Sequence, residues 1–365
     1  RPAVRASMDA SPSAVHCQRG KAGMNRFASM SATDRLAVVA EAAARRQIQP
    51  VIMEKDFWVC WMLGLLFARP EWSEALVFKG GTALSKVFGI IRRFSEDIDL
   101  SVSPEALGIS ESEVEQAGSR RQRDQWEETL EATCSRWVEQ QLQTELEQAV
   151  QAVIGQKPGA QEWLEFRTDE TTQSPVLLFY YPSVLAEGTA YIRRWVKLEF
   201  GSLTDQQPVG RHRVSPWLAD ILPAPLAEMG CDVVALEVER AFWEKATILH
   251  SEYHRDPATP MPRNYSRHYA DVGAMANRPE AGRALMDHEL RERVVGWKSR
   301  FFPRRWARYD LARPGTFRLV PPEARMAELA RDYQEMRDMF LDTPPSLKEI
   351  METLSDLETR INRIA

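Results

Sequence analysis

The chain has 365 residues, 44% of them hydrophobic and 27% charged, and its formal net charge is −5. This size and apolar content are sufficient for one large domain or two ordinary ones. The acidic balance excludes a strongly basic nucleic-acid coat, although it is compatible with a local basic patch. The four cysteines lie far apart and form no Cys-x-x-Cys motif, which argues against a zinc knuckle or a disulfide framework and favours a reducing cytoplasm.

The N-terminal part of the sequence predicts an extension followed by two helices. Residues 1–23 lack the apolar run of a secretory signal and have few periodic hydrophobic residues, so we expect a disordered or extraneous extension there, with the folded domain beginning at Met24. Apolar residues at helical spacing predict helices over 31–46 and 50–67. The longest apolar runs, such as 58–68, are too short to cross a bilayer, so no membrane association is expected.

The next segment, FKGGTALSKVFGIIRRFSEDIDLSV (78–102), joins a glycine pair to an Asp-x-Asp pair. The apolar residues before the glycines predict a strand over 74–78. A short helix over 82–91 and a second strand over 97–102 follow. The glycine pair and the acidic pair are therefore expected at the same end of a sheet.

The remainder of the chain alternates helical and extended patterns. The long charged segment 112–154 has an apolar stripe at helical spacing, and strands are predicted over 174–183 and 191–201. Residues 206–223 are rich in proline and predict a loop, whereas residues 231–255 begin extended and become a helix. This order of helices, strands and further helices indicates an α+β fold with helical additions.

The glycine pair and the acidic pair have complementary chemistry. Gly80 and Gly81 would expose backbone N–H groups at a helix start, where phosphate groups bind, and Thr82 adds a hydroxyl. Asp97 and Asp99 are two residues apart, so both carboxylates face the same side of a strand. Hard oxygen ligands in this arrangement suit Mg²⁺ carrying a triphosphate, and the chemistry that uses them is in-line displacement at phosphorus.

Each of these motifs also has an ordinary explanation. Most glycine pairs are only turns, and Asp-x-Asp pairs occur on solvated strands. The P-loop pattern is absent, and Lys86 lies inside the predicted short helix, where it is a candidate nucleotide-binding side chain. Glu199, on the alternating strand VKLEF (196–200), is the candidate third metal carboxylate, and a charged strand edge facing water is the alternative.

These residues resemble the DNA polymerase β-like nucleotidyltransferase superfamily, whose hallmark is a Gly-Gly or Gly-Ser turn, a short helix and an Asp-x-Asp or Asp-x-Glu strand. The amino-acid sequence is more similar still to the AbiEii/AbiGii toxin family, which includes the MenT toxins. The resemblance spans about residues 24–362, and separated blocks carry it in the family's order: EKDFWV (54–59), FKGGTALSKVFG (78–89), RFSEDIDL (93–100), ERAFWEKATILHSEYHR (239–255) and SRHYADV (266–272).

The resemblance implies a two-lobed cytoplasmic enzyme of α+β class. A polymerase β-like nucleotidyltransferase core, a mixed sheet with helices, would occupy residues 24–225, with a helical insertion near 112–154. A mainly helical C-terminal lobe over 226–365 would complete the active site. The implied reaction transfers a nucleotide from a nucleoside triphosphate to an acceptor, releases pyrophosphate and depends on Mg²⁺ or Mn²⁺.

The resemblance also implies a biological setting and partners. The acceptor in characterised members is tRNA, which suggests the tRNA 3′ end, and the outcome is growth arrest by a toxin of a type IV toxin–antitoxin or phage-abortive-infection system. A winged helix-turn-helix antitoxin is the expected protein partner.

By position, the resemblance assigns Gly80, Gly81 and Thr82 to the triphosphate and Asp97 and Asp99 to the metal. Gly81 stands where classical members have serine, so Thr82 is expected to supply the hydroxyl group.

Three further residues, all late in the chain, follow from the resemblance. Lys245 would neutralise phosphate charge, Asp271 would be the late acidic residue near the active site, and Arg267 would bind phosphate or the RNA backbone. A solvated helix face is the alternative for Lys245, and a helix cap or surface acid is the alternative for Asp271.

Three functions remain open on the sequence alone. The first is a Mg²⁺-dependent nucleotidyltransferase acting on RNA. The second is a nucleotide-binding regulatory or partner-binding protein without transfer activity, against which the intact glycine and acidic pairs argue. The third is nucleotide transfer to a protein or a small molecule.

Overall fold

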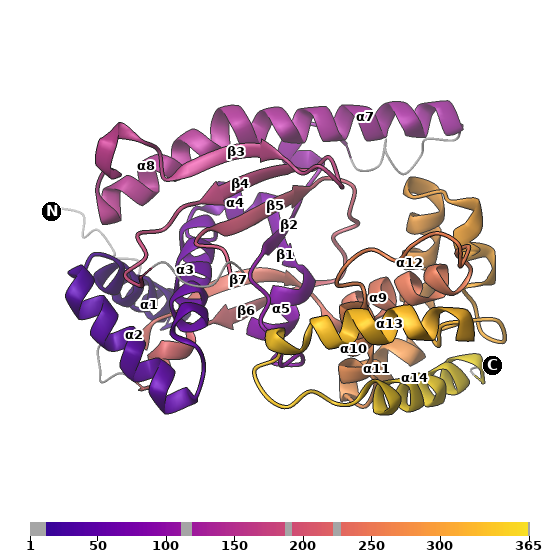
Figure 1. Ribbon diagram of the computed structural model, residues 1–365. Coiled ribbons are helices and arrows are strands. Elements are labelled where there is room, and N and C mark those ends of the chain that lie inside the picture. The colour runs from indigo at the N-terminus through magenta and orange to yellow at the C-terminus, as the bar shows by residue number, and fades with distance from the viewer. Residues whose placement is uncertain (1–11, 111–118, 187–191, 222–227, 364–365) are drawn as a thin grey trace, which may run out of the picture.

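The computed structural model describes residues 12–110, 119–186, 192–221 and 228–363. Within them, one seven-stranded mixed sheet has the order β3-β4-β5-β2-β1-β7-β6 (Figure 1). The strands are β1 Leu76–Lys79, β2 Ile98–Val102, β3 Leu164–Thr168, β4 Pro175–Phe179, β5 Val196–Gly201, β6 Val209–Val214 and β7 Cys231–Leu236.

Helices precede, interrupt and follow the sheet strands. The sheet side of the molecule carries α1 Pro12–Ala28, α2 Ala32–Arg46, α3 Pro50–Leu66, α4 Pro70–Ala75, α5 Gly80–Lys86, α7 Arg120–Trp137 and α8 Gln143–Ile154. The C-terminal part is helical, with α9 Val238–Tyr253, α10 Ser266–Ala276, α11 Pro279–Met286, α12 His288–Phe301, α13 Glu323–Glu335 and α14 Leu347–Asn362 (Figure 1). The predicted α+β class, with a mixed sheet and a helical C-terminal part, is confirmed.

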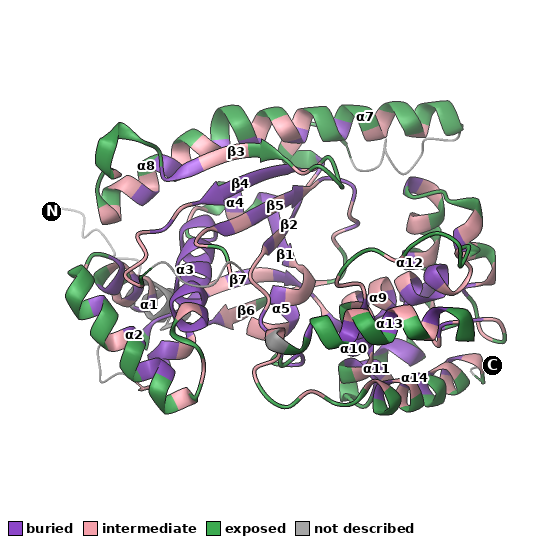
Figure 2. Cartoon of the chain, in the orientation of Figure 1, coloured by how far each residue is buried: buried purple, intermediate pink, exposed green. Residues whose placement is uncertain are grey.

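The buried apolar side chains form two large clusters, one for each side of the molecule. The first surrounds α3, in which every residue from Ile52 to Leu66 is buried, and includes the inward-facing residues of the strands (Figure 2). The second joins α9, α10 and α14 with α11, α12 and α13. No helix among the described residues is long and apolar enough to cross a membrane.

Strand register brings the acidic pair to the glycine turn. β1 and β2 are antiparallel with Lys79 opposite Asp99, and β5 lies parallel to β2 with Glu199 beside Asp99. Ile98 is fully buried, as the period of two predicts for the residue between the two acids. The glycine turn and both acids therefore share one end of the sheet.

Three segments differ from the sequence-based expectations. Residues 206–223 were expected to be a loop, but 209–214 form the edge strand β6, whose residues VGRHRV pair with β7 and leave little apolar signal. The strand β3 was not predicted, because its sequence LEFRT is short and half-exposed. The predicted helix over 82–91 ends at Lys86, because Gly89 takes a positive φ of 59° that turns the chain back.

Of the two predicted boundaries of the nucleotidyltransferase core, one lies within a helix and the other lies outside the described residues. Helix α1 runs across the expected start at Met24, whose side chain is buried together with Phe27, while residues 1–11 lie outside the described residues. The expected boundary at 225–226 also lies outside them, and β7, which follows it, belongs to the sheet. The predicted helical insertion comprises α7, a π-helical turn and α8.

One buried carboxylate ties the two sides of the molecule together. Asp205 follows β5 and is 1% exposed. It accepts hydrogen bonds from Arg240 on α9 and from both Nε (2.6 Å) and Nη2 (2.8 Å) of Arg293 on α12. Although burial acts to raise it, the pKa of Asp205 is lowered by these two arginines. The contact therefore depends on an ionised carboxylate.

We expect Asp205→Asn to lower the free energy of unfolding by about 3–5 kcal/mol, because it leaves the buried Arg240 guanidinium without its counter-charge. Chemical denaturation at neutral pH measures this loss. Glu41→Gln, in an exposed ion pair with Arg45, is the matched control and should leave the midpoint unchanged. An unchanged midpoint for the Asp205 variant would contradict the role of this contact.

Candidate active site

A cavity of about 650 Å³ opens where the sheet end meets α9 and the segment before α10. Its walls come from segments far apart in the sequence, and both acidic and basic side chains line it. The charged and polar residues that line it are Lys79, Ser95, Asp97, Asp99, Asp169, Thr171, Thr172, Lys197, Glu199, Arg93, Glu244, Lys245, Arg263, Arg267 and His268, and Gly80 and Gly81 line it as well.

The glycine pair is required by the close approach of the acidic strand. Gly80 has a φ of 80°, and a Cβ placed on it would lie 1.9 Å from Oδ2 of Asp99. A Cβ on Gly81 would lie 2.8 Å from Nη2 of Arg93 and 2.9 Å from Oγ of Ser95. Both positions therefore exclude a side chain, and the backbone of the turn lies directly against the carboxylate.

Thr82 has a different position from the one expected. The residue is fully buried, and its hydroxyl donates to the backbone carbonyl of Asp97 and contacts Oγ of Ser95 at 3.0 Å. This hydroxyl is therefore used to hold the turn against the start of β2 and does not face the cavity. Ser95 does line the cavity, and its Oγ would lie 2.9 Å from a Cβ placed on Gly81.

The two aspartates share a strongly acidic environment. Burial, with the charges of Asp99 and Glu96, raises the pKa of Asp97 to about 7. Burial and the charge of Glu199 also raise the pKa of Asp99, although Lys79, Arg267 and Lys245 act against the rise. The protein's own cations thus fail to balance these carboxylates, which is the condition under which a bound cation is stabilising.

This donor set fits a divalent cation that keeps part of its shell outside the protein. Among the described residues, no group of three or more His, Cys, Asp or Glu side chains is arranged to hold a metal ion. Mg²⁺ is commonly bound by one or two carboxylates and completes its shell with water and substrate phosphates. Asp97 and Asp99 are the residues here that match this pattern.

Glu199 faces the same cavity, as its strand position predicts, but its carboxylate is already engaged. It accepts a hydrogen bond from Nζ of Lys197 at 2.8 Å and one from the hydroxyl of Thr172 at 3.3 Å. Lys197 also contacts Asp169 at 2.6 Å. Glu199 thus shares the single cation Lys197 with Asp169 at the cavity wall, beside the aspartate pair.

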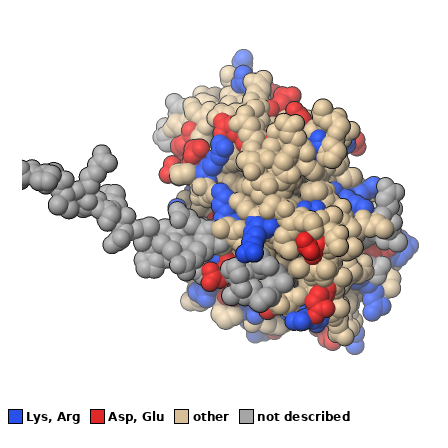
Figure 3. Space-filling model, turned by 90° about the vertical axis from the view of Figure 1, so that its left-hand side faces the viewer, with Lys and Arg blue, Asp and Glu red and all other residues tan. Residues whose placement is uncertain are grey.

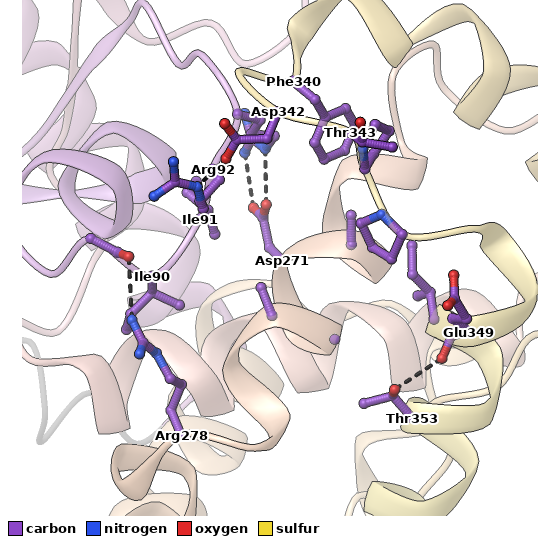
Figure 4. Close-up of a pocket in the computed structure, with 18 residues that line it drawn as sticks. Ile90, Ile91, Arg92, Asp271, Arg278, Phe340, Asp342, Thr343, Glu349 and Thr353 are labelled. Carbon is purple, nitrogen blue, oxygen red and sulfur yellow. Dashed lines mark hydrogen bonds and ion pairs between the residues drawn. The ribbon is translucent and has the colours of Figure 1, made fainter. Parts of the chain in front are cut away.

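Lys245 and Asp271 come together around a third residue, Arg93. Asp271 is 1% exposed, and its carboxylate accepts hydrogen bonds from Nε and Nη2 of Arg93, each at 2.9 Å (Figure 4). Nζ of Lys245 lies 2.9 Å from Oδ2 of the same carboxylate. Burial acts to raise the pKa of Asp271, but Arg93 and Lys245 hold it well below its usual range. Both cations line the cavity and Asp271 does not, so the carboxylate orients them from behind.

The other predicted cations take different positions. Arg267 lines the cavity, and its charge acts on Asp99. Lys86 is outside the cavity lining: its Nζ contacts Oδ1 of the buried Asp56 at 2.6 Å and lies 4.4 Å from the ring centroid of Trp217. Lys86 follows Gly81 by five residues, about 140° around the helix, and so points away from the cavity. We therefore no longer assign it to the nucleotide.

Sequence reasoning did not assign several cavity residues to the site. Lys79 and Ser95 lie within the recognised blocks, so their neighbourhood was a usable signal. Arg93 was considered only as part of a basic patch, although it lies closest to Asp271. Asp169 reaches the cavity through the turn between β3 and β4, and no sequence pattern marks it.

A second cavity, of about 580 Å³, lies on the other side of the Arg93–Asp271 pair (Figure 4). The chain segment before α14 forms part of its wall and pairs with the backbone that leads to the acids: the N–H of Phe94 donates to Met339 O at 2.6 Å, and that of Leu341 donates to Arg92 O at 3.0 Å. Arg92 and Asp342 add an exposed ion pair. The C-terminal part of the chain thus holds the loop that carries Arg93.

Comparisons with known proteins indicate the family of this chain. The family described as nucleotidyl transferase AbiEii toxin, type IV toxin–antitoxin system, matches residues 64–358. No curated protein matches the chain. Among solved structures, the chain is similar to MenT4, a nucleotidyltransferase toxin from Mycobacterium tuberculosis H37Rv, with 17% identity, a TM-score of 0.42 and coverage of 88% of this chain and 97% of that one.

We expect Asp271→Asn to lower the free energy of unfolding by about 3–5 kcal/mol, since Arg93 and Lys245 lose their shared counter-charge. Because the pKa of Asp271 is lowered by folding, its contribution is fully present above the ordinary aspartate pKa and is lost as the pH falls below it. Denaturation curves for wild type and variant should therefore keep their full separation from pH 7 down to about pH 4 and begin to approach each other only below that pH. Asp342→Asn, in the exposed pair with Arg92, is the control, and a variant as stable as this control at pH 7 would refute the expectation.

The opposite sign is expected for Asp97→Asn in protein stripped of divalent ions. The folded-state pKa of about 7 lies above the ordinary value, so the folded protein binds more protons and wild-type stability falls as the pH rises toward 7. The variant avoids this loss and should melt above wild type at pH 8 and close to it at pH 4. The gain has a ceiling of about 4 kcal/mol, at about 1.4 kcal/mol per pKa unit, which water in the open cavity reduces. Melting in EDTA measures it, and a variant that melts below wild type at pH 8 would exclude the charge argument.

Proposed function

The chain belongs to the AbiEii family of nucleotidyltransferase toxins of type IV toxin–antitoxin systems, and we propose that it transfers a nucleotide from a nucleoside triphosphate to an RNA acceptor in the cytoplasm. The tRNA 3′ end is the acceptor that we expect. The observation that carries the proposal is the juxtaposition of two under-neutralised aspartates with Lys245 and Arg93 across one cavity. A triphosphate with its metal ion supplies the complementary charges to both sides.

The proposed roles follow from the positions of the side chains. Asp97 and Asp99 would hold Mg²⁺ or Mn²⁺, which would supply Lewis-acid stabilisation of the negative charge that develops during nucleotide transfer. The glycine turn at 80–81 gives the triphosphate close access to backbone N–H groups. Glu199 adjoins Asp99 and would act on the metal only after release from Lys197.

The cationic wall of the cavity, which consists of Lys245, Arg93 and Arg267, would bind the departing pyrophosphate. Lys245, Arg93 and Arg267 line the cavity opposite the acids, where they can neutralise charge as pyrophosphate separates. Asp271 is the positioning residue for Lys245 and Arg93, because it contacts both side chains and does not itself line this cavity. Residues 24–225 and 226–365 would then be two lobes that each supply one wall of the site.

The family membership also implies an antitoxin, and we propose a winged helix-turn-helix protein encoded beside this chain as that partner. Two other functions compete with RNA nucleotidylation: nucleotide binding without transfer, and transfer to a protein or a small molecule. The paired carboxylates favour transfer, since binding alone needs no such costly burial of like charges.

We expect purified protein to label RNA when it is incubated with total RNA, Mg²⁺ and one nucleoside triphosphate at a time, each labelled at the α-phosphate. The variant Asp97→Asn/Asp99→Asn should lose about 100-fold or more of this activity while it stays folded. Asp124→Asn/Asp220→Asn removes two exposed carboxylates in surface ion pairs and should keep full activity.

The same reactions separate the alternatives. Label in protein or in a small molecule in place of RNA would identify a different acceptor, and bound nucleotide without any labelled product would identify a binding protein. Undiminished RNA labelling by the double aspartate variant would overturn the site assignment.

A further inference from the structure

An exposed cluster of arginines and aromatic rings lies at the C-terminal end of α9, and we call it the arginine–aromatic surface. It consists of Arg255, Arg304, Arg308 and Arg318 with Tyr253 and Trp306. The guanidinium groups of Arg255 and Arg304 lie 5.5 and 6.0 Å from the ring centroid of Trp306, and that of Arg318 lies 5.4 Å from the ring of Tyr253. The cluster therefore alternates cations with π-faces.

The charge of this region contrasts with the rest of the chain. Residues 297–318 contain seven Lys or Arg residues and one Asp, in a chain whose net charge is −5. Five of the seven are exposed arginines: Arg304, Arg305, Arg308, Arg313 and Arg318. On the face drawn in Figure 3, by contrast, Lys and Arg are interspersed with Asp and Glu among wide uncharged areas. Residues 297–318 thus carry a local excess of positive charge in the C-terminal part of the chain.

The arginine–aromatic surface is continuous with the mouth of the candidate active site. Helix α9 carries Lys245 in the cavity and Tyr253 eight residues later, about 12 Å along the same helix. Tyr265 joins the two from the other side, because its ring lies 4.8 Å from that of the cavity residue His268. Burial raises the pKa of Tyr265, and the charges of both Arg255 and Arg267 act against the rise, so Tyr265 is within electrostatic range of a surface arginine and a cavity arginine.

We propose that the arginine–aromatic surface binds the RNA acceptor strand and directs its end into the cavity. This proposal rests on the proposed function, since it names the surface that holds the acceptor of that reaction. Guanidinium forks match phosphate geometry, and arginine–aromatic stacks accept unstacked bases, which is the combination used to bind single-stranded RNA. The carboxylates of an acidic protein partner would bind the arginines alone, and the aromatic rings would then have no base to stack against.

The present partners of the surface arginines do not oppose this role. Arg308 pairs with Asp310, and Arg318 pairs with Glu358 at 3.2 Å, but both arginines are nearly half-exposed. Ion pairs in such solvated positions contribute little, so phosphate groups can replace the carboxylates at small cost. The two rings themselves lie in regular elements, Tyr253 in the last turn of α9 and Trp306 in the 3₁₀ helix Arg305–Ala307.

The test compares Arg304→Glu/Arg308→Glu/Arg318→Glu with wild type in binding of a fluorescein-labelled tRNA pool, measured by anisotropy without nucleoside triphosphate. We expect the dissociation constant to rise at least about 10-fold at 100 mM salt and the slope of log K against log salt to fall by about 2, for three phosphate contacts. Arg45→Glu/Arg120→Glu/Arg136→Glu makes the same charge change at exposed positions of the sheet side and should bind like wild type. Thermal melting verifies folding, and the Gln version of the triple variant should show a smaller loss in the same direction.

The outcomes distinguish the docking surface from the proposed function. If the triple variant binds the tRNA pool no worse than the control variant, the docking surface is wrong, whether or not wild type labels RNA. If wild type binds through this surface but transfers no label to RNA, the proposed function fails and the docking surface stands. If the triple variant loses labelling of a protein while its RNA binding is unchanged, the surface serves an acidic protein and the RNA proposal is overturned.

Discussion

The carboxylate of Asp271 holds together the two halves of the candidate active site. It lies on α10 in the helical part of the molecule, yet its partners come from both parts: Arg93 from the loop before β2 and Lys245 from α9. A buried anion with two cations is stable only while all three are in place. The position of the cationic wall relative to the two aspartates therefore depends on the packing of the helical part against the sheet, and Asp205 adds a second contact of the same kind.

Sequence reasoning was most successful where a single short segment contained all the information. Gly80, Gly81, Asp97 and Asp99 lie in one block, and the period of two for strands predicted the side on which the acids face. The alternation of polar and apolar residues in its own strand was also enough to predict the side on which Glu199 lies, and sheet register then places it beside Asp99. The family resemblance located Lys245, Arg267 and Asp271, which no local pattern connects to the acids, but it gave no geometry: Asp271 lies behind the cations and not in the cavity.

The failures share a physical cause, which is that side-chain direction depends on packing. Thr82 was expected to present its hydroxyl to phosphate, yet it is consumed in holding the start of β2. Lys86 is on the wrong face of a two-turn helix, where Asp56 from α3 provides its counter-charge. Asp169 arrives through the β3–β4 turn, and β3 itself has too weak a pattern to be predicted. In each case a distant segment decided what the local sequence left undetermined.

The pairing of residues 339–341 with residues 92–94 has a consequence for how the protein is made. The segment that holds the Arg93 loop lies about 250 residues after it and close to the C-terminal end of the sequence. Chains leave the ribosome N-terminus first, at about 5–20 residues per second, so the glycine turn and the aspartates emerge well before α10 and the segment that holds Arg93. The two aspartates are therefore present before the residues that complete the cationic side of the cavity, and the loop that carries Arg93 reaches its position only after residue 341 has been synthesised.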